Sequence, residues 1–222
     1  MLNLIKSNLI VSCQALENEP LHSSFIMGRM ALAAKDGGAV AIRAQSKEDI
    51  IEIKKVTGLP VIGLVKKNYE NSEVFITATK AEVDELIESG CEMIALDSTL
   101  RERPAESLKE LYDYIHENGR LIMADISTLE EGINAYELGA DCISTTLSGY
   151  TSYSPQSKEP DLNLITELSN KVNVPVIGEG RIDTPQHLVE AYKAGAYSVV
   201  VGSAITRPQL ITKKFTDVLS DI

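Results

Sequence analysis

The sequence predicts an α/β protein in which one (β/α)8 barrel domain spans residues 1–222. Short β-rich segments recur along the chain, amphipathic stretches with helical spacing lie between them, and a glycine followed by a small residue repeatedly separates a helix from the next strand. Strict alternation of strands and helices requires a parallel sheet. Eight such units in a chain of this length favour a closed barrel. An open, doubly wound sheet is the alternative, although no G-x-G-x-x-G motif follows the first strand.

The predicted strands are apolar without strict alternation, which is typical of parallel strands covered on both faces. We expect strands at residues 9–13, 39–43, 61–65, 93–97, 121–125, 142–146, 174–178 and 198–202. The longest irregular stretch, residues 147–161, follows the sixth of these strands. In a barrel, a loop at this position lies on the catalytic face.

Helices are expected between the strands because the apolar positions there follow a helical period. Residues 81–90 place apolar side chains at i, i+3 and i+4 and end at Gly90, a typical stop signal. Residues 128–139 open with a capping box formed by Thr128 and Glu131, and they also end at a glycine. In the segment that follows the first strand, Ser23 or Ser24 is expected to cap a helix. No catalytic role is assigned to the histidines.

The composition excludes several classes of protein. The net charge of −11, from 21 basic and 32 acidic side chains, repels nucleic acids and anionic membrane surfaces, so neither is an expected partner. The three cysteines contain no C-x-x-C pair and predict neither a disulfide framework nor a zinc site. Residues 1–11 are too short and too polar for a signal peptide, and no later segment reaches the length of a membrane span. We therefore expect a cytoplasmic protein.

Polar residues and a Gly-Ser pair stand at or directly after the carboxyl ends of the predicted strands, where the chemistry of a (β/α)8 barrel is located. In chain order they are Gln14, Arg43, Lys66, Asp97, Asp125, Thr145, Thr146, Glu179, Gly202 and Ser203. Any single one could be polar only because strand ends meet solvent. Together they indicate one polar site at the mouth of the barrel.

Lys66 is the strongest candidate for a general base. It follows a hydrophobic strand, where desolvation or a cationic neighbour such as Arg43 would lower the pKa of its amine towards neutrality. Lys67 is expected to point into solvent, because successive strand residues alternate. Asp125 and Glu179 supply carboxylates, one to hold Lys66 in an ion pair and the other to relay a proton. Alternatively, these carboxylates serve only as partners of Arg43 and Arg181.

The last two strand-to-helix loops are predicted to bind phosphate. Gly180 and Gly202 let the backbone amides approach an anion, and (β/α)8 barrels commonly bind phosphate at these loops. Arg181 and Arg207 add charged hydrogen-bond donors. Pro208 is expected to begin a helix.

Several motifs at these strand ends resemble the bacterial N-acetylmannosamine-6-phosphate 2-epimerases. The resemblance extends over essentially the whole chain and is carried by residues 10–16 (IVSCQAL), 19–24 (EPLHSS), 41–44 (AIRA), 63–67 (GLVKK), 124–127 (ADIS), 144–150 (STTLSGY), 178–181 (GEGR) and 204–208 (AITRP). It implies a step in sialic acid and amino sugar catabolism that converts N-acetylmannosamine 6-phosphate into N-acetylglucosamine 6-phosphate.

The resemblance also implies roles for individual residues. The catalytic lysine and glutamate of the family fall on Lys66 and Glu179, with Asp125 beside them. The substrate-binding set comprises Gln14, Arg43, Thr146, Gly180, Arg181, Gly202, Ser203 and Arg207. Ser203 departs from the family, which usually has a second glycine there, but its backbone amide can still bind phosphate. No metal site and no cofactor are expected.

The expected reaction inverts the carbon C2 of the sugar by two kinds of proton transfer. Glu179 assists ring opening and closure, and Lys66, oriented by Asp125, removes and returns the C2 proton. An aldolase or lyase that uses Lys66 to form a Schiff base is the second hypothesis. A phosphosugar-binding sensor without catalytic activity is the third. The sequence leaves the association of the barrels open, with a homodimer among the assemblies considered.

Overall fold

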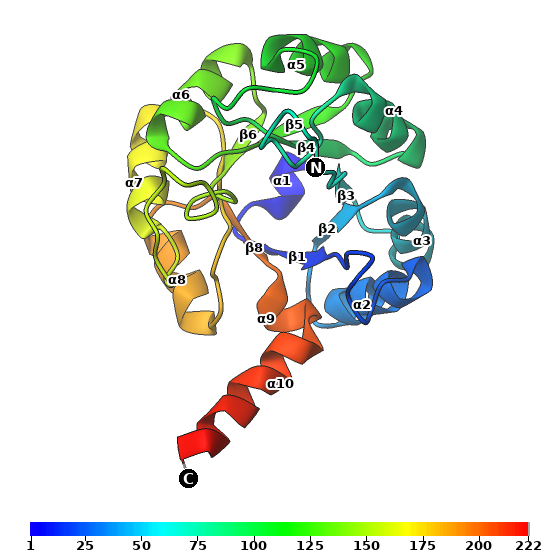
Figure 1. The fold of residues 1–222 in the computed structure, drawn as a ribbon, viewed down its shortest axis with the longest axis vertical. Coiled ribbons are helices and arrows are strands. Elements are labelled where there is room, and N and C mark those ends of the chain that lie inside the picture. The colour runs from blue at the N-terminus through cyan, green and yellow to red at the C-terminus, as the bar shows by residue number, and fades with distance from the viewer. Residues whose placement is uncertain (222) are drawn as a thin grey trace.

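The computed structural model describes residues 1–221 and contains a closed barrel of eight parallel strands in the order β1 to β8 (Figure 1). The strands are β1 (Leu9–Cys13), β2 (Ala41–Gln45), β3 (Val61–Leu64), β4 (Met93–Asp97), β5 (Leu121–Asp125), β6 (Cys142–Ser144), β7 (Val176–Gly178) and β8 (Ser198–Val201). The last strand pairs with the first, with Leu9 opposite Val199. The predicted barrel is therefore confirmed, and the open sheet is excluded.

Helices cover the outside of the barrel and follow the strands in turn (Figure 1). They are α2 (Ser24–Asp36), α3 (Lys47–Thr57), α4 (Lys80–Ser89), α5 (Leu108–Glu117), α6 (Leu129–Leu138), α7 (Leu162–Lys171) and α8 (Pro185–Lys193). The short α1 (Leu2–Ile5) lies over the barrel axis, and its buried Ile5 packs against the interior side chains of the strands.

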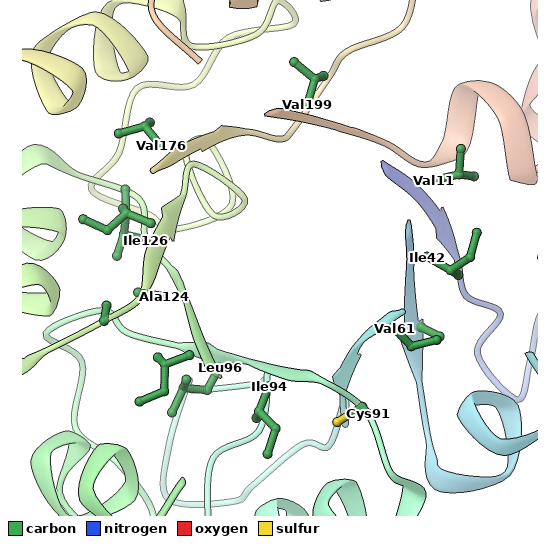
Figure 2. Close-up of a cluster of buried hydrophobic side chains, with 14 of the residues drawn as sticks. Val11, Ile42, Val61, Cys91, Ile94, Leu96, Ala124, Ile126, Val176 and Val199 are labelled. Atoms are coloured by element: carbon green, nitrogen blue, oxygen red, sulfur yellow. The ribbon is translucent and has the colours of Figure 1, made fainter. Parts of the chain in front are cut away.

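Two apolar layers stabilise the fold. The outer layer lies between strands and helices, and Figure 2 shows part of it, with Val11, Ile42 and Ile94 pointing away from the barrel axis. The inner layer fills the barrel with residues such as Ile10 and Ile62. Successive strand residues belong to opposite layers, as the pleat requires. The carboxyl ends of the strands depart from this pattern because polar side chains, Arg43 among them, enter the interior there.

Helix ends agree with most of the predicted signals, but several strands are shorter than predicted: β3 ends at Leu64, β6 at Ser144 and β8 at Val201, and β7 begins at Val176. The capping box of Thr128 and Glu131 is present, and Gly90 and Gly139 end their helices in the left-handed region. β2 begins at Ala41 instead of Ala39, because residues 37–39 still donate hydrogen bonds back to the last turn of α2. Ser23 occupies the N-cap position of α2 without a side-chain cap bond, and Ser24 donates to Asp49 instead.

The segment after β8 does not complete the ring of helices. It forms α9 (Ser203–Thr206), α10 (Pro208–Asp217) and a short 3-10 helix, η1 (Val218–Asp221). α9 lies between α8 and α2, and α10 then runs away from the barrel (Figure 1). No residue of α10 is buried. Among residues 1–221, no helix is both long and apolar enough to cross a membrane.

Candidate active site

A cavity of about 630 Å³ opens at the carboxyl ends of the strands, where the sequence predicts the site. Ten of the predicted residues line it, namely Gln14, Arg43, Lys66, Thr146, Glu179, Gly180, Arg181, Gly202, Ser203 and Arg207. Asp125 is fully buried and does not line the cavity. The structure therefore brings the predicted set together, with Asp125 supporting it from inside the barrel.

Arg43 is the centre of the polar network beside this cavity. Its side chain is 1% exposed, and its guanidinium binds both Asp125 oxygens, with Nη1 2.9 Å from Oδ1 and Nη2 2.6 Å from Oδ2. Nη1 also lies 2.6 Å from Glu179 Oε2. Thr146 Oγ1 joins the network at 2.7 Å from Asp125 Oδ1 and 3.1 Å from Glu179 Oε2. One buried cation thus fixes two carboxylates whose strands are separated by β6.

Lys66 follows β3 and directs its amine at the cavity without an ion-pair partner among the described residues. The pKa of the amine is lowered from 10.5 to about 8, chiefly by burial and also by the positive charges of Arg43 and Arg207, against the opposing pull of Glu179 and Asp125. This is the direction that the sequence predicts. The expected ion pair between Lys66 and a carboxylate is wrong, because Arg43 occupies both carboxylates. Lys67 is exposed, as predicted.

Glu179 is partly buried at the mouth of the barrel, immediately after β7. Burial raises the pKa of its carboxyl group, and the charge of Asp125 acts in the same direction, whereas Arg43 opposes both. Its Oε2 accepts the hydrogen bonds from Arg43 and Thr146, and the described residues offer no donor to Oε1. One carboxylate oxygen is therefore fixed and the other is available to a ligand.

The side of the cavity that the sequence predicts to bind phosphate is formed by the loops after β7 and β8. Gly180 has a φ of 102°, which favours glycine, and Gly202 is the N-cap of α9. Arg207 is held by Glu19, with Arg207 Nε 2.9 Å from Glu19 Oε1 and Nη2 3.0 Å from Oε2. Its Nη1 donates to the Ser203 hydroxyl at 3.3 Å. Pro208 begins α10, as predicted.

Arg181 is arranged differently from the expected phosphate donor. Its Nη1 donates to the carbonyl of Ser148 at 2.7 Å, and its Nη2 donates to the carbonyl of Gly149 at 2.8 Å. The guanidinium carbon lies 4.5 Å from the centre of the Tyr150 ring. Arg181 is therefore engaged by the loop after β6, and neither Asp125 nor Glu179 is its partner.

Sequence reasoning missed several residues of the site. Ser12 lines the cavity and accepts a hydrogen bond from Gln14 Nε2 at 2.8 Å. The alternation of strand residues was a usable signal, because Ser12 and Gln14 are two positions apart. Tyr150 and Arg101 also line the cavity but lie on loops whose course has no periodic signal.

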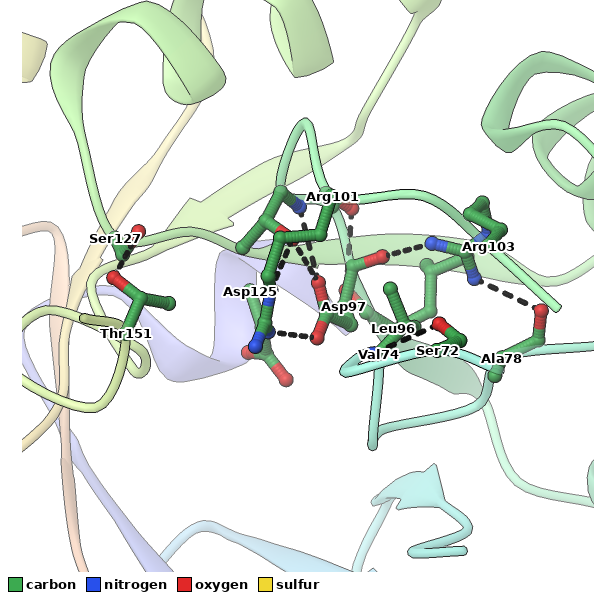
Figure 3. Close-up of polar contacts among 12 residues, drawn as sticks. Ser72, Val74, Ala78, Leu96, Asp97, Arg101, Arg103, Asp125, Ser127 and Thr151 are labelled. Carbon is green, nitrogen blue, oxygen red and sulfur yellow. Dashed lines mark hydrogen bonds and ion pairs between the residues drawn. The ribbon is translucent and has the colours of Figure 1, made fainter. Parts of the chain in front are cut away.

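The carboxylate at the end of β4 has a structural partner. Arg101 Nη2 lies 2.6 Å from Asp97 Oδ2, and Arg103 donates to the backbone carbonyl of Asp97 (Figure 3). Asp97 thus positions the loop after β4, including the cavity-lining Arg101. No group of three or more His, Cys, Asp or Glu side chains within residues 1–221 is placed to hold a metal ion.

Comparison with known proteins assigns the family. The family model NanE, described as "Putative N-acetylmannosamine-6-phosphate epimerase", matches residues 27–221. Proteins named "Putative N-acetylmannosamine-6-phosphate 2-epimerase" from Clostridium perfringens (strain SM101 / Type A) and Clostridioides difficile (strain 630) are similar. The first is 66% identical over 99% of this chain and 100% of its own length. The second is 64% identical over 97% of each chain.

A solved structure agrees with these sequence matches. The N-acetylmannosamine-6-phosphate 2-epimerase from Clostridium perfringens superimposes with a TM-score of 0.97 and 65% identity, covering 98% of this chain and 96% of that one. Thiamine phosphate pyrophosphorylase from Pyrococcus furiosus, at 20% identity and a TM-score of 0.62, shares the fold alone. The chain belongs to the NanE family of N-acetylmannosamine-6-phosphate epimerases.

Proposed function

We propose that this chain interconverts N-acetylmannosamine 6-phosphate and N-acetylglucosamine 6-phosphate by inverting C2, as a step in sialic acid and amino sugar catabolism. Family membership supports the substrate class, a sugar phosphate. The observation that carries the chemistry is the Lys66 amine, whose pKa is lowered to about 8 and which faces a cavity without a carboxylate partner. Such an amine is partly neutral near pH 7 and can accept a proton from carbon.

The reaction needs an open-chain sugar, because the C2 hydrogen of the closed pyranose is not acidic. Opening the ring moves a proton from the C1 hydroxyl to the ring oxygen and leaves an aldehyde at C1. Removal of the C2 proton then places the electron pair of the C–H bond on the aldehyde oxygen as an enolate. Return of a proton to the opposite face of C2 inverts the centre. Every step of this route is a proton transfer with no change of oxidation state, so the route itself uses no cofactor.

Lys66 and Glu179 divide these proton transfers. Lys66 exchanges the C2 proton, because its amine has no partner in the described structure. Glu179 assists ring opening and closure through Oε1, while Oε2 is fixed by Arg43. The raised pKa of Glu179 favours this role, because a carboxyl group that gains a proton readily can also donate one.

Asp125 supports the reaction without contacting the sugar. It is 0% exposed and binds Arg43 through both of its oxygens. We therefore assign Asp125 as a positioning residue that orients Arg43 and Thr146. This replaces the prediction that Asp125 orients Lys66. Arg43 lines the cavity and carries the positive charge that would stabilise the enolate oxygen.

The remaining predicted residues bind the substrate in this proposal. The backbone amides at Gly180, Gly202 and Ser203, together with Arg207, hold the 6-phosphate. Gln14 contacts the sugar. Its Oε1 is buried without a hydrogen-bond donor among the described residues, so it is available to a hydroxyl or amide of the ligand. The free, buried cysteines Cys13, Cys91 and Cys142 support a cytoplasmic location, because a reducing compartment keeps thiols unpaired.

Proton NMR with N-acetylmannosamine 6-phosphate in deuterated water tests the proposal. We expect N-acetylglucosamine 6-phosphate to form with deuterium at C2. Lys66→Ala should slow both product formation and deuterium incorporation by a factor of about 10²–10⁴. Absence of turnover by the wild-type protein would contradict the proposal, whereas calorimetric binding without turnover would support a sensor. A covalent adduct trapped by borohydride in the presence of substrate would support Schiff-base chemistry instead.

We propose a homodimer as the assembly, because α10 runs away from the barrel and leaves a gap in the ring of helices between α8 and α2, where the short α9 lies (Figure 1). Large apolar side chains are exposed on α10 and η1, including Phe215 at 72%, and on the elements that border the gap, including Phe25 of α2 at 62% and Val189 of α8 at 42%. A second copy can cover the gap with its own α10, and a reciprocal exchange closes with two-fold symmetry. Light scattering should give a dimer for the wild type and a monomer for Phe215→Asp. A monomeric wild type contradicts this assembly.

A further inference from the structure

Arg181 fastens the tip of the loop between β6 and α7 to the loop after β7. Its two terminal nitrogens donate to consecutive carbonyls, those of Ser148 and Gly149, at 2.7 Å and 2.8 Å. The side chain of Tyr150 covers the guanidinium at 4.5 Å. A planar guanidinium is suited to such a forked contact, which a lysine amine cannot reproduce.

The backbone on both sides is shaped for this contact. Arg181 has a φ of 56°, in the left-handed region that side chains other than glycine rarely adopt. Gly149 has a φ of 74°, and a Cβ there would lie 2.3 Å from Arg181 Nη2. Backbone strain of this kind persists where the surrounding structure holds it. Both residues are therefore adapted to a close approach of the two loops.

Other bonds hold this loop, its tip included, but do not join the tip to the loop after β7. The Ser148 hydroxyl donates to Asp161 at 2.6 Å, and the Gly149 amide donates to Ser154 Oγ at 2.8 Å. Thr151 Oγ1 donates to Ser127 at 3.1 Å (Figure 3), and the Tyr153 hydroxyl donates to Glu131 at 2.6 Å. The last two anchors lie towards α6. Tyr150 lines the cavity although the residue is 62% exposed, and the contact that its ring makes is with the Arg181 guanidinium.

We infer that Arg181 is a positioning residue that holds the segment 148–150 against the β7 loop, so that Tyr150 forms one wall of the substrate cavity. The inference rests on the proposed function, and it replaces the role of phosphate donor that the sequence predicts for Arg181 with support of the cavity wall. Its two terminal nitrogens, Nη1 and Nη2, donate to protein carbonyls. We therefore assign phosphate binding to Arg207 and to the backbone amides of the loops after β7 and β8. Loss of the contact weakens substrate binding through Tyr150 and leaves the affinity for phosphate itself intact.

Three variants separate the two roles of Arg181. Arg181→Met removes the two hydrogen bonds to the Ser148 and Gly149 carbonyls. Gly149→Ala keeps the arginine but displaces its guanidinium. Lys158→Met is the control, which removes a charge from an exposed position of the same loop. Amide hydrogen exchange of residues 148–150 in the ligand-free protein should rise about tenfold in the first two variants and stay unchanged in the third. This readout does not depend on catalysis.

Kinetics and phosphate binding complete the test. For Arg181→Met and Gly149→Ala we expect KM to rise about tenfold with kcat within about threefold, and the dissociation constant of inorganic phosphate to stay within about twofold of wild type. A phosphate affinity that falls with KM in Arg181→Met alone, or unchanged exchange in both variants, overturns the inference. If the wild type lacks turnover, the proposed function fails, while exchange and phosphate binding still decide the role of Arg181.

Discussion

Lys66→Met should make the folded protein more stable at neutral pH while removing its activity. The lowering of the Lys66 pKa from 10.5 to about 8 means that the folded protein disfavours the charged amine. A pKa shift of one unit corresponds to about 1.36 kcal/mol. The shift of Lys66 therefore means that its protonated amine destabilises the fold by about 3 kcal/mol at pH 7. Methionine has similar length and carries no charge, so it is free of this penalty.

The sign of the pH dependence follows from proton binding. Between the folded and unfolded pKa values the unfolded chain binds more protons than the folded one, so the free energy of unfolding of the wild type rises with pH in this window. The advantage of Lys66→Met should therefore decrease from about 3 kcal/mol at pH 7 to about 1.4 kcal/mol at pH 9.5, and vanish above 10.5.

Urea denaturation of wild type and variant at pH 7 and pH 9.5 measures this difference. The matched control is Lys158→Met, which removes a lysine from an exposed position and should change stability by no more than about 0.5 kcal/mol at either pH. A Lys66→Met variant that is no more stable than wild type at pH 7 would refute the reasoning. So would a difference that does not depend on pH.

Three further predictions concern the same network. The kcat/KM of the wild type should rise with pH up to an apparent pKa of about 8 and then level off, because only neutral Lys66 accepts the C2 proton; a flat profile from pH 6 to 9 would contradict this. Lys66→Ala and Glu179→Gln should each lower kcat by a factor of about 10²–10⁴ with the circular dichroism spectrum retained, whereas Lys67→Ala should keep wild-type turnover. Asp125→Asn should lower the free energy of unfolding by about 3–5 kcal/mol, because it leaves the buried Arg43 with one carboxylate fewer; an unchanged denaturation midpoint would refute this.

The fold was predictable because its signals are local. The capping box of Thr128 and Glu131 and the left-handed glycines Gly90 and Gly139 each depend on only a few neighbouring residues. The course of α10 was not predictable, since an amphipathic helix that leaves the barrel has the same residue pattern as one that packs on it.

The candidate site was predictable as a set but not in its pairings. The rule that functional residues follow the barrel strands located Lys66, Arg43 and Glu179 at one cavity. The choice of partners depends on distances across the barrel, where Arg43 meets side chains 82 and 136 positions away in the chain. Sequence carries no local signal for such a contact, so the pairing of Asp125 with Lys66 was wrong.

In the proposed reaction, the cations that would bind the substrate, Arg43 and Arg207, also lower the pKa of the base, Lys66. Both side chains line the cavity that an anionic sugar phosphate would enter. In a protein with a net charge of −11, these side chains provide a local positive field that the overall charge does not. Asp125 and Glu179 partly neutralise the charge of Arg43, and Glu19 partly neutralises the charge of Arg207. Because burial is the largest cause of the Lys66 shift, the amine stays activated even when a bound phosphate offsets Arg207.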